Sequence, residues 1–304
     1  MRLAVILVHG IGDQGPDWAD AIMSALASAV SAQLAGLGLG TVTADEALVL
    51  SRAHWAAALQ ARQRALGELL AGAVPVKSRG AWWRRLWDTA RRELQRRQAR
   101  FITEFIGDVI GYRDPAAREQ IYAAIRDALG QAAAQASADP APLTIIAHSL
   151  GTVISSDFVW DETEARLAQG ARGFHPRLRL ENFFTVGSPL ALFALQYGGP
   201  EAFTKPIRME SPTGRWVNIY DPDDPVAMPL TTLNAAYAQA VLQDALVDAG
   251  PYLLAHLRYF TRPETLTMIS RKLALDWAAH NQRLAPARLA ELYAAYDRTL
   301  GLAG

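Results

Sequence analysis

The chain has 304 residues, of which 51% are hydrophobic and 20% are charged, so it can bury a large core and is not intrinsically disordered. Lys and Arg together number 30, as do Asp and Glu, and this balance argues against general nucleic-acid binding, which requires a basic excess. The absence of cysteine excludes disulfides, thiolate metal ligands and a cysteine nucleophile.

The first apolar run, residues 3–8, is only six residues long and ends at His9-Gly10. A secretory signal needs a longer apolar stretch with a cleavage site, and a membrane-spanning helix needs about 18 apolar residues. No run in the sequence approaches that length. We therefore expect a soluble, cytoplasmic protein.

Short apolar runs alternate with longer helical patterns along the chain. Strands are predicted at residues 3–8, 143–147, 181–186 and 216–220, with a weaker candidate at 47–50. Helices are predicted at residues 17–35, 115–136, 152–169 and 231–248, and again after Pro263. Continuously apolar strands are typical of a parallel sheet that is covered on both faces. We expect an α/β fold with a mostly parallel central sheet flanked by helices.

The segment at about residues 54–112 contains no convincing strand. Its apolar side chains recur at steps of three and four from residue 83 to residue 109, which predicts one face of a long helix. Residues 77–100 hold nine Lys or Arg side chains and only two acidic ones. The sequence therefore predicts a helical, cap-like insertion within a single domain that covers residues 1–304.

Three tryptophans of the insertion, Trp82, Trp83 and Trp87, lie among these basic side chains. Aromatic and basic residues on one helix can bind a membrane surface or anionic lipid, so a peripheral membrane contact is one interpretation. The other is that the apolar stripe packs on the sheet or on a second copy, and the continuation of the stripe to Phe101 and Phe105 favours it. The arginines lack an accompanying element that would read nucleic acid, so no nucleic-acid partner is expected.

A candidate nucleophile lies in Ala147-His148-Ser149-Leu150-Gly151, where a predicted strand runs directly into a predicted helix. Such a sharp turn forces the serine into strained backbone angles and exposes its hydroxyl, and it needs small residues on either side. The helix N-terminus would also supply a free N–H group at Leu150. The alternative interpretation is a serine that merely caps a helix.

A glycine-rich turn, His9-Gly10-Ile11-Gly12, closes the first predicted strand. A turn of this kind can direct a backbone N–H group into the space above the sheet. The Ile11 N–H would then join the Leu150 N–H in an oxyanion hole. Glycines commonly follow strands, so this signal depends on the serine motif for its meaning.

A candidate acid follows the strand predicted at residues 216–220. Asp221, Asp223 and Asp224 all lie there, and Asp224 is preferred because Pro225-Val226 turns the chain back after it. Asp221 is the main alternative. A calcium loop is disfavoured because the cluster lacks the alternating oxygen ligands of such loops, and a solvated turn is the structural alternative.

The base should be a histidine that follows the acid in the chain, since imidazole can take and return a proton near neutral pH. Of the six histidines, only His256 and His280 satisfy that order. His280 lies in an amphipathic helical pattern, where a surface histidine is the ordinary explanation. His256 lies in a short segment bounded by Gly250-Pro251 and Arg262-Pro263, and it is the preferred base.

Taken in order, these motifs resemble the lipase-like and esterase-like members of the α/β-hydrolase superfamily. The matching segments are residues 9–12, 147–151, 182–190 and 221–226, together with His256. The resemblance implies a carboxyl-ester hydrolase in which Ser149 attacks, His256 transfers the proton and Asp224 orients the imidazole, with no metal or organic cofactor. It also implies that Ser188 shapes a turn. Small lipases lack the insertion at about 54–112.

Hydrophobic acyl esters or lipids are the expected substrates. Two alternatives remain open: a thioesterase or acyltransferase that uses the same triad, and a catalytically silent lipid- or partner-binding protein. The Ser, Asp, His order argues against a silent protein but does not test activity.

Overall fold

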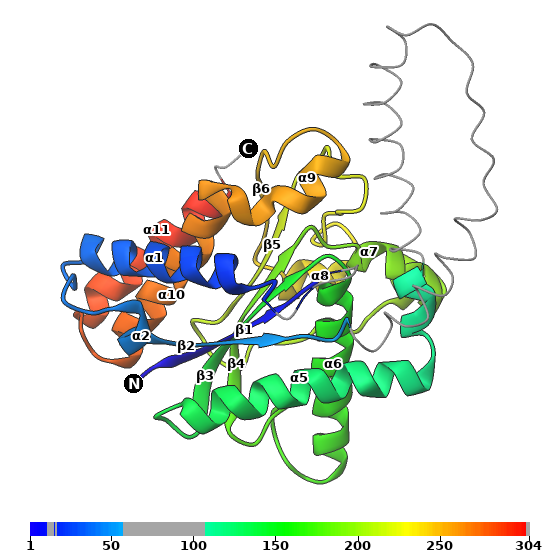
Figure 1. Cartoon of the computed structure of the whole chain (residues 1–304), viewed down its shortest axis with the longest axis horizontal. Helices are drawn as coiled ribbons and strands as arrows, with labels where there is room; N and C mark the ends of the chain where they lie inside the picture. The colour runs from blue at the N-terminus through cyan, green and yellow to red at the C-terminus, as the bar shows by residue number, and fades with distance from the viewer. Residues whose placement is uncertain (11–14, 16, 57–106, 302–304) are drawn as a thin grey trace, which may run out of the picture.

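The computed structural model describes residues 1–10, 15, 17–56 and 107–301 (Figure 1). The predicted oxyanion donor Ile11 lies outside these ranges, as do Trp82, Trp83 and Trp87 and most of the predicted insertion. Of that insertion the structure describes only its two ends, and residues 107–112 at the second end are helical.

A six-stranded sheet forms the centre of the described structure. Its strands are β1 (Leu3–Val8), β2 (Leu48–Ala53), β3 (Ala141–His148), β4 (Leu178–Val186), β5 (Arg215–Tyr220) and β6 (Gln243–Leu246). They lie in the order β2-β1-β3-β4-β5-β6, and each pair of neighbours is parallel. The predicted α/β fold with a mostly parallel sheet is therefore confirmed.

Helices cover both faces of this sheet (Figure 1). One face carries α1 (Asp20–Gly36), α10 (Pro263–His280) and α11 (Pro286–Leu300), and the other carries α5 (Pro115–Gln135) and α6 (Leu150–Ala168). Side chains of β1 alternate between two apolar clusters, with Ile6 in one and Val5 in the other, because successive residues of a strand point to opposite faces. No helix in the described ranges has both the length and the apolar character needed to cross a membrane.

The chain changes direction across the sheet between β1 and β3. After β1 it adds β2 on one side and then returns to add β3 on the other, so β1 and β3 are adjacent in space but not in order. In open α/β sheets, ligands bind beyond the carboxyl ends of the strands at such a switch point. His9-Gly10 follows β1, and His148-Ser149 lies at the end of β3.

The helix predicted at residues 231–248 is wrong. The structure has the short helix α8 (Ala235–Ala240) followed by β6, which pairs with β5. The Asn234 side chain accepts hydrogen bonds from two N–H groups of the first turn of α8 and so sets its start. The Asp244 carboxylate accepts the N–H groups of Leu230 and Thr231 at 2.8 and 2.9 Å, which holds β6 beside this loop. Edge pairing therefore overrides the local helical periodicity.

The remaining elements are short. They comprise α2 (Ala44–Ala47), α7 (Leu190–Phe193), α9 (Leu253–Arg258) and three 3₁₀ turns, η1 (Ala194–Tyr197), η2 (Pro200–Ala202) and η3 (Tyr259–Thr261). Of these, α9 and η3 are the ones that contribute to the candidate site.

Candidate active site

Ser149 occupies a strained turn between β3 and α6. Its φ and ψ are 52° and −131°, in a region that residues other than glycine rarely adopt. The Ser149 N–H donates to the Val186 carbonyl at 2.9 Å, which fixes the turn against β4. Ser149 therefore has the local geometry that the sequence predicts for a nucleophile.

Two glycines allow the chain to pack closely around this serine. A Cβ on Gly151 would lie 2.3 Å from the His9 carbonyl oxygen, so α6 can approach the end of β1 only because residue 151 is glycine. A Cβ on Gly10 would lie 2.5 Å from the Ser149 Cβ. The motifs after β1 and β3 are therefore in direct contact, as their order in the sequence suggests.

The structure brings Ser149, His256 and Asp224 together from three separate parts of the chain. The His256 Nε2 lies 2.7 Å from the Ser149 Oγ, and the His256 Nδ1 lies 2.7 Å from the Asp224 Oδ2. All three residues are at most 2% exposed. The His256 Nδ1–H donates a hydrogen bond to Asp224. The His256 Nε2 is therefore unprotonated and can accept the hydrogen bond of the Ser149 hydroxyl.

The two competing residues have other partners. Asp221 accepts the N–H groups of Asp223 at 2.8 Å and Ala249 at 2.6 Å, so it ties together two loops. His280 lies 2.7 Å from a carboxylate oxygen of Glu181 and its side chain is partly exposed. Within the described part of the chain, neither residue is hydrogen-bonded to Ser149.

Three donors surround the Asp224 carboxylate. Besides His256, the Val226 N–H donates to Oδ1 at 2.9 Å and the Tyr259 hydroxyl donates to Oδ2 at 2.8 Å. Burial by itself raises the pKa of Asp224, but the hydrogen bonds from His256, Val226 and Tyr259 hold it below its ordinary value. Asp224 is therefore held as a carboxylate.

Tyr259 is a residue that sequence reasoning missed. Its hydroxyl also accepts the Asp221 N–H at 3.0 Å, so it fixes both ends of the loop that carries Asp224. Burial and the neighbouring carboxylate raise the pKa of Tyr259, which keeps its proton available for donation. Tyr259 lies three residues after His256, at helical spacing, and that spacing was the available signal.

His148 links the turn at Ser149 to the segment that carries His256. Its Nε2 lies 2.8 Å from the main-chain carbonyl oxygen of His256. Burial lowers the pKa of His148 to about 3, so the ring is neutral and Nε2 carries the proton that it donates. His148 therefore holds the main chain of the candidate base in place, a contact that the sequence did not reveal.

His9 supports the turn after β1 in a similar way. Burial lowers its pKa to about 3, and its Nε2 accepts the N–H groups of Trp55 and Ala56, each at 3.3 Å. The proton is therefore on Nδ1, which donates to the Gly10 carbonyl oxygen at 2.7 Å. Its ring stacks on the Trp55 indole with the ring centroids 4.5 Å apart.

The predicted oxyanion donors are described only in part. Leu150 is the first residue of α6, and the first N–H groups of a helix have no partner within that helix. The Leu150 N–H therefore lies at the start of α6, next to Ser149, whereas Ile11 lies outside the described residues. Ser188 accepts the Leu190 N–H at 3.2 Å and lies 2.7 Å from the Thr152 hydroxyl, contacts that suit the predicted role in shaping a turn.

Among the described residues, no group of three or more His, Asp or Glu side chains is arranged to hold a metal ion.

Comparison with known proteins assigns no family to this chain. A scan against protein-family models gives no match for the chain, and a search of curated proteins gives none either. The arrangement of Ser149, His256 and Asp224 is accordingly interpreted from its own geometry.

Proposed function

We propose that this protein is a serine hydrolase of the α/β-hydrolase superfamily that cleaves carboxyl esters. The observation that carries the proposal is the unbroken chain of hydrogen bonds from Ser149 Oγ through His256 to Asp224, each 2.7 Å long. The strained serine turn at the carboxyl end of a parallel strand supports the same reading.

In the proposed reaction, the Ser149 oxygen attacks the ester carbonyl carbon while His256 Nε2 takes the hydroxyl proton. His256 then returns that proton to the departing alcohol, which leaves an acyl group on Ser149. Water enters, gives its proton to His256 and attacks the acyl-enzyme, so that the acid is released and Ser149 is restored. Asp224 stays ionised throughout and stabilises the imidazolium.

The negative charge that develops on the carbonyl oxygen requires hydrogen-bond donors beside Ser149. The Leu150 N–H is one proposed donor, and the N-terminus of α6 adds a favourable field. The Ile11 N–H is the second proposed donor. Each donor of this kind typically stabilises the transition state by about 3 kcal/mol.

Covalent labelling with a fluorophosphonate tests the proposal directly. We expect the probe to label the wild-type protein and to fail on Ser149→Ala, with hydrolysis of p-nitrophenyl esters falling by about a thousandfold or more. Ser155→Ala is the matched control, because Ser155 is buried on the same helix and its hydroxyl has no hydrogen-bond partner. This control should be labelled like the wild type.

Folded wild-type protein that resists the probe would contradict the proposal and would favour a lipid- or partner-binding protein on the same fold. Comparison of oxygen esters with matched thioesters, and of water with added alcohols as acceptors, separates ester hydrolysis from thioesterase and acyltransferase activity. We expect oxygen-ester hydrolysis to dominate.

A further inference from the structure

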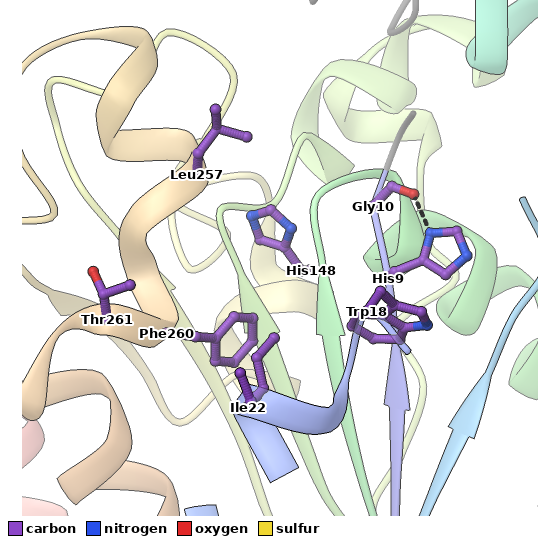
Figure 2. A pocket seen from close by; sticks show the side chains of 9 residues that line it. His9, Gly10, Trp18, Ile22, His148, Leu257, Phe260 and Thr261 are labelled. Atoms are coloured by element: carbon purple, nitrogen blue, oxygen red, sulfur yellow. Dashed lines mark hydrogen bonds between the residues drawn. The ribbon is translucent and has the colours of Figure 1, made fainter. Parts of the chain in front are cut away.

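A cavity of about 410 Å³ lies at the carboxyl edge of the sheet, between the first turns of α1 and the α9–η3 segment (Figure 2). Its base is formed by His9, Gly10 and His148, from the ends of β1 and β3. It therefore occupies the switch point of strand order, where open α/β sheets bind ligands.

Ser149 and His256 each have a chain neighbour in the wall of this cavity. His148 precedes Ser149, and Leu257 follows His256. Gly10 faces the Ser149 Cβ so closely that a side chain at residue 10 would collide with it. A substrate held in the cavity is therefore next to the groups that would cleave it.

The chemistry of the lining selects an uncharged group. Large apolar side chains come from both walls, with Trp18 in the turn before α1, Ile22 on α1 and Phe260 on η3. Among the residues that the structure describes, none of those that line the cavity is Lys, Arg, Asp or Glu. Both histidines of the base are held neutral by burial, so the described part of the lining carries no charge at physiological pH.

We propose that this cavity binds a single uncharged, apolar arm of the ester substrate, an assignment that rests on the proposed function. Ligand cavities span about 300–1,000 Å³, and this one lies near the lower limit, so it suits one short chain or ring better than the two chains of a diacyl lipid. Leu257 lines the cavity although it is 64% exposed, which places it at the mouth.

Two substitutions at exposed positions change the size of the cavity without removing core side chains. Ala21→Phe adds a ring to the α1 wall, and Leu257→Ala widens the mouth. The matched controls are Ala32→Phe, which is exposed further along α1, and Leu254→Ala, which is 39% exposed on α9. Neither control position lines the cavity.

The first measurement is kcat/KM for p-nitrophenyl esters from acetate to decanoate. We expect Ala21→Phe to lose at least about tenfold on the longer esters relative to acetate, and Leu257→Ala to shift the optimum toward larger acyl groups. The control variants should keep the wild-type profile. A terminal carboxylate on a long ester should lower kcat/KM by at least about tenfold, because the described lining contains no Lys or Arg to pair with a buried charge.

The second measurement is calorimetric binding of a neutral decyl ester to Ser149→Ala, which does not depend on turnover. We expect adding Ala21→Phe to weaken binding at least about fivefold, and adding Ala32→Phe to leave it unchanged. Equal binding in both, or an unchanged chain-length profile in variants that fluorophosphonate still labels, would overturn the cavity assignment. If fluorophosphonate fails to label the wild-type protein, the hydrolase proposal is overturned instead. The calorimetric measurement would still show whether the cavity binds an apolar arm.

Discussion

Replacement of Gly151 by alanine tests how closely α6 packs against the end of β1. Alanine is normally preferred to glycine within a helix, so local propensity predicts a gain in stability. Here the added Cβ would lie 2.3 Å from the His9 carbonyl oxygen and 2.8 Å from the Val8 carbonyl oxygen. The tertiary contact therefore predicts the opposite sign.

The magnitude follows from these distances. Real Cβ contacts are essentially never shorter than 3.0 Å, so the helix and the strand end must separate by about 0.7 Å. Both opposing groups are backbone atoms, which cannot move aside by changing rotamer. Overpacking typically costs about 1–3 kcal/mol, and we expect Gly151→Ala to lie at the upper end of that range.

Gly130→Ala is the matched control, because Gly130 is an exposed residue within α5 and its added Cβ would meet no atom within 4 Å. It should stabilise the protein by about 0.5–1 kcal/mol. The assay is denaturant unfolding of both variants and the wild type. The midpoints are compared where the slope of the unfolding free energy against denaturant concentration is the same in all three proteins. A Gly151→Ala protein as stable as the wild type would refute the argument that close packing dictates glycine at this position.

Two further predictions concern buried polar groups. Tyr259→Phe removes the donor at 2.8 Å from Asp224, so the pKa of Asp224 should rise, and the acid limb of kcat/KM, which requires ionised Asp224, should move to higher pH. Tyr296→Phe, whose buried hydroxyl has no partner, is the control, and a fall in activity with an unmoved limb would contradict this role. His9 has a pKa of about 3 when folded and about 6.5 when unfolded, so between these values the unfolded state binds more protons and stability falls as pH falls. Between pH 6.5 and 5, His9→Gln should reduce the slope of the unfolding free energy against pH by up to about 1.4 kcal/mol per unit, and an equal slope in both proteins would count against a buried neutral His9.

Local sequence patterns were sufficient for most of the sheet. The strand predicted at residues 3–8 coincides with β1, the one at 143–147 is extended at both ends to residues 141–148, and the one at 216–220 begins one residue earlier. Continuous apolar runs identify such strands because both of their faces are buried. By contrast, β6 is a half-buried edge strand of four residues, and its sequence does not distinguish it from the helix that precedes it.

The candidate site divides in the same way. The turn at Ser149 is encoded locally, since a strand, small residues and a helix follow one another directly in the sequence. The choice of Asp224 over Asp221 depends on which carboxylate faces a histidine that lies 32 residues further along. In the structure the carboxylate that contacts His256 is that of Asp224. The catalytic role of Ser149, His256 and Asp224 stays a prediction.

The sequence by itself determined the α/β class, the position of the serine turn and the order of the candidate residues, because each depends on neighbours within a few positions. Only the tertiary structure decided that Tyr259 and His148 secure Asp224 and His256, and that a cavity with no charged side chain among its described lining residues lies between α1 and η3. Those features arise from side chains that meet across the edge of the sheet. Their distances and burial depend on how separate elements pack, and local sequence patterns carry no record of that packing.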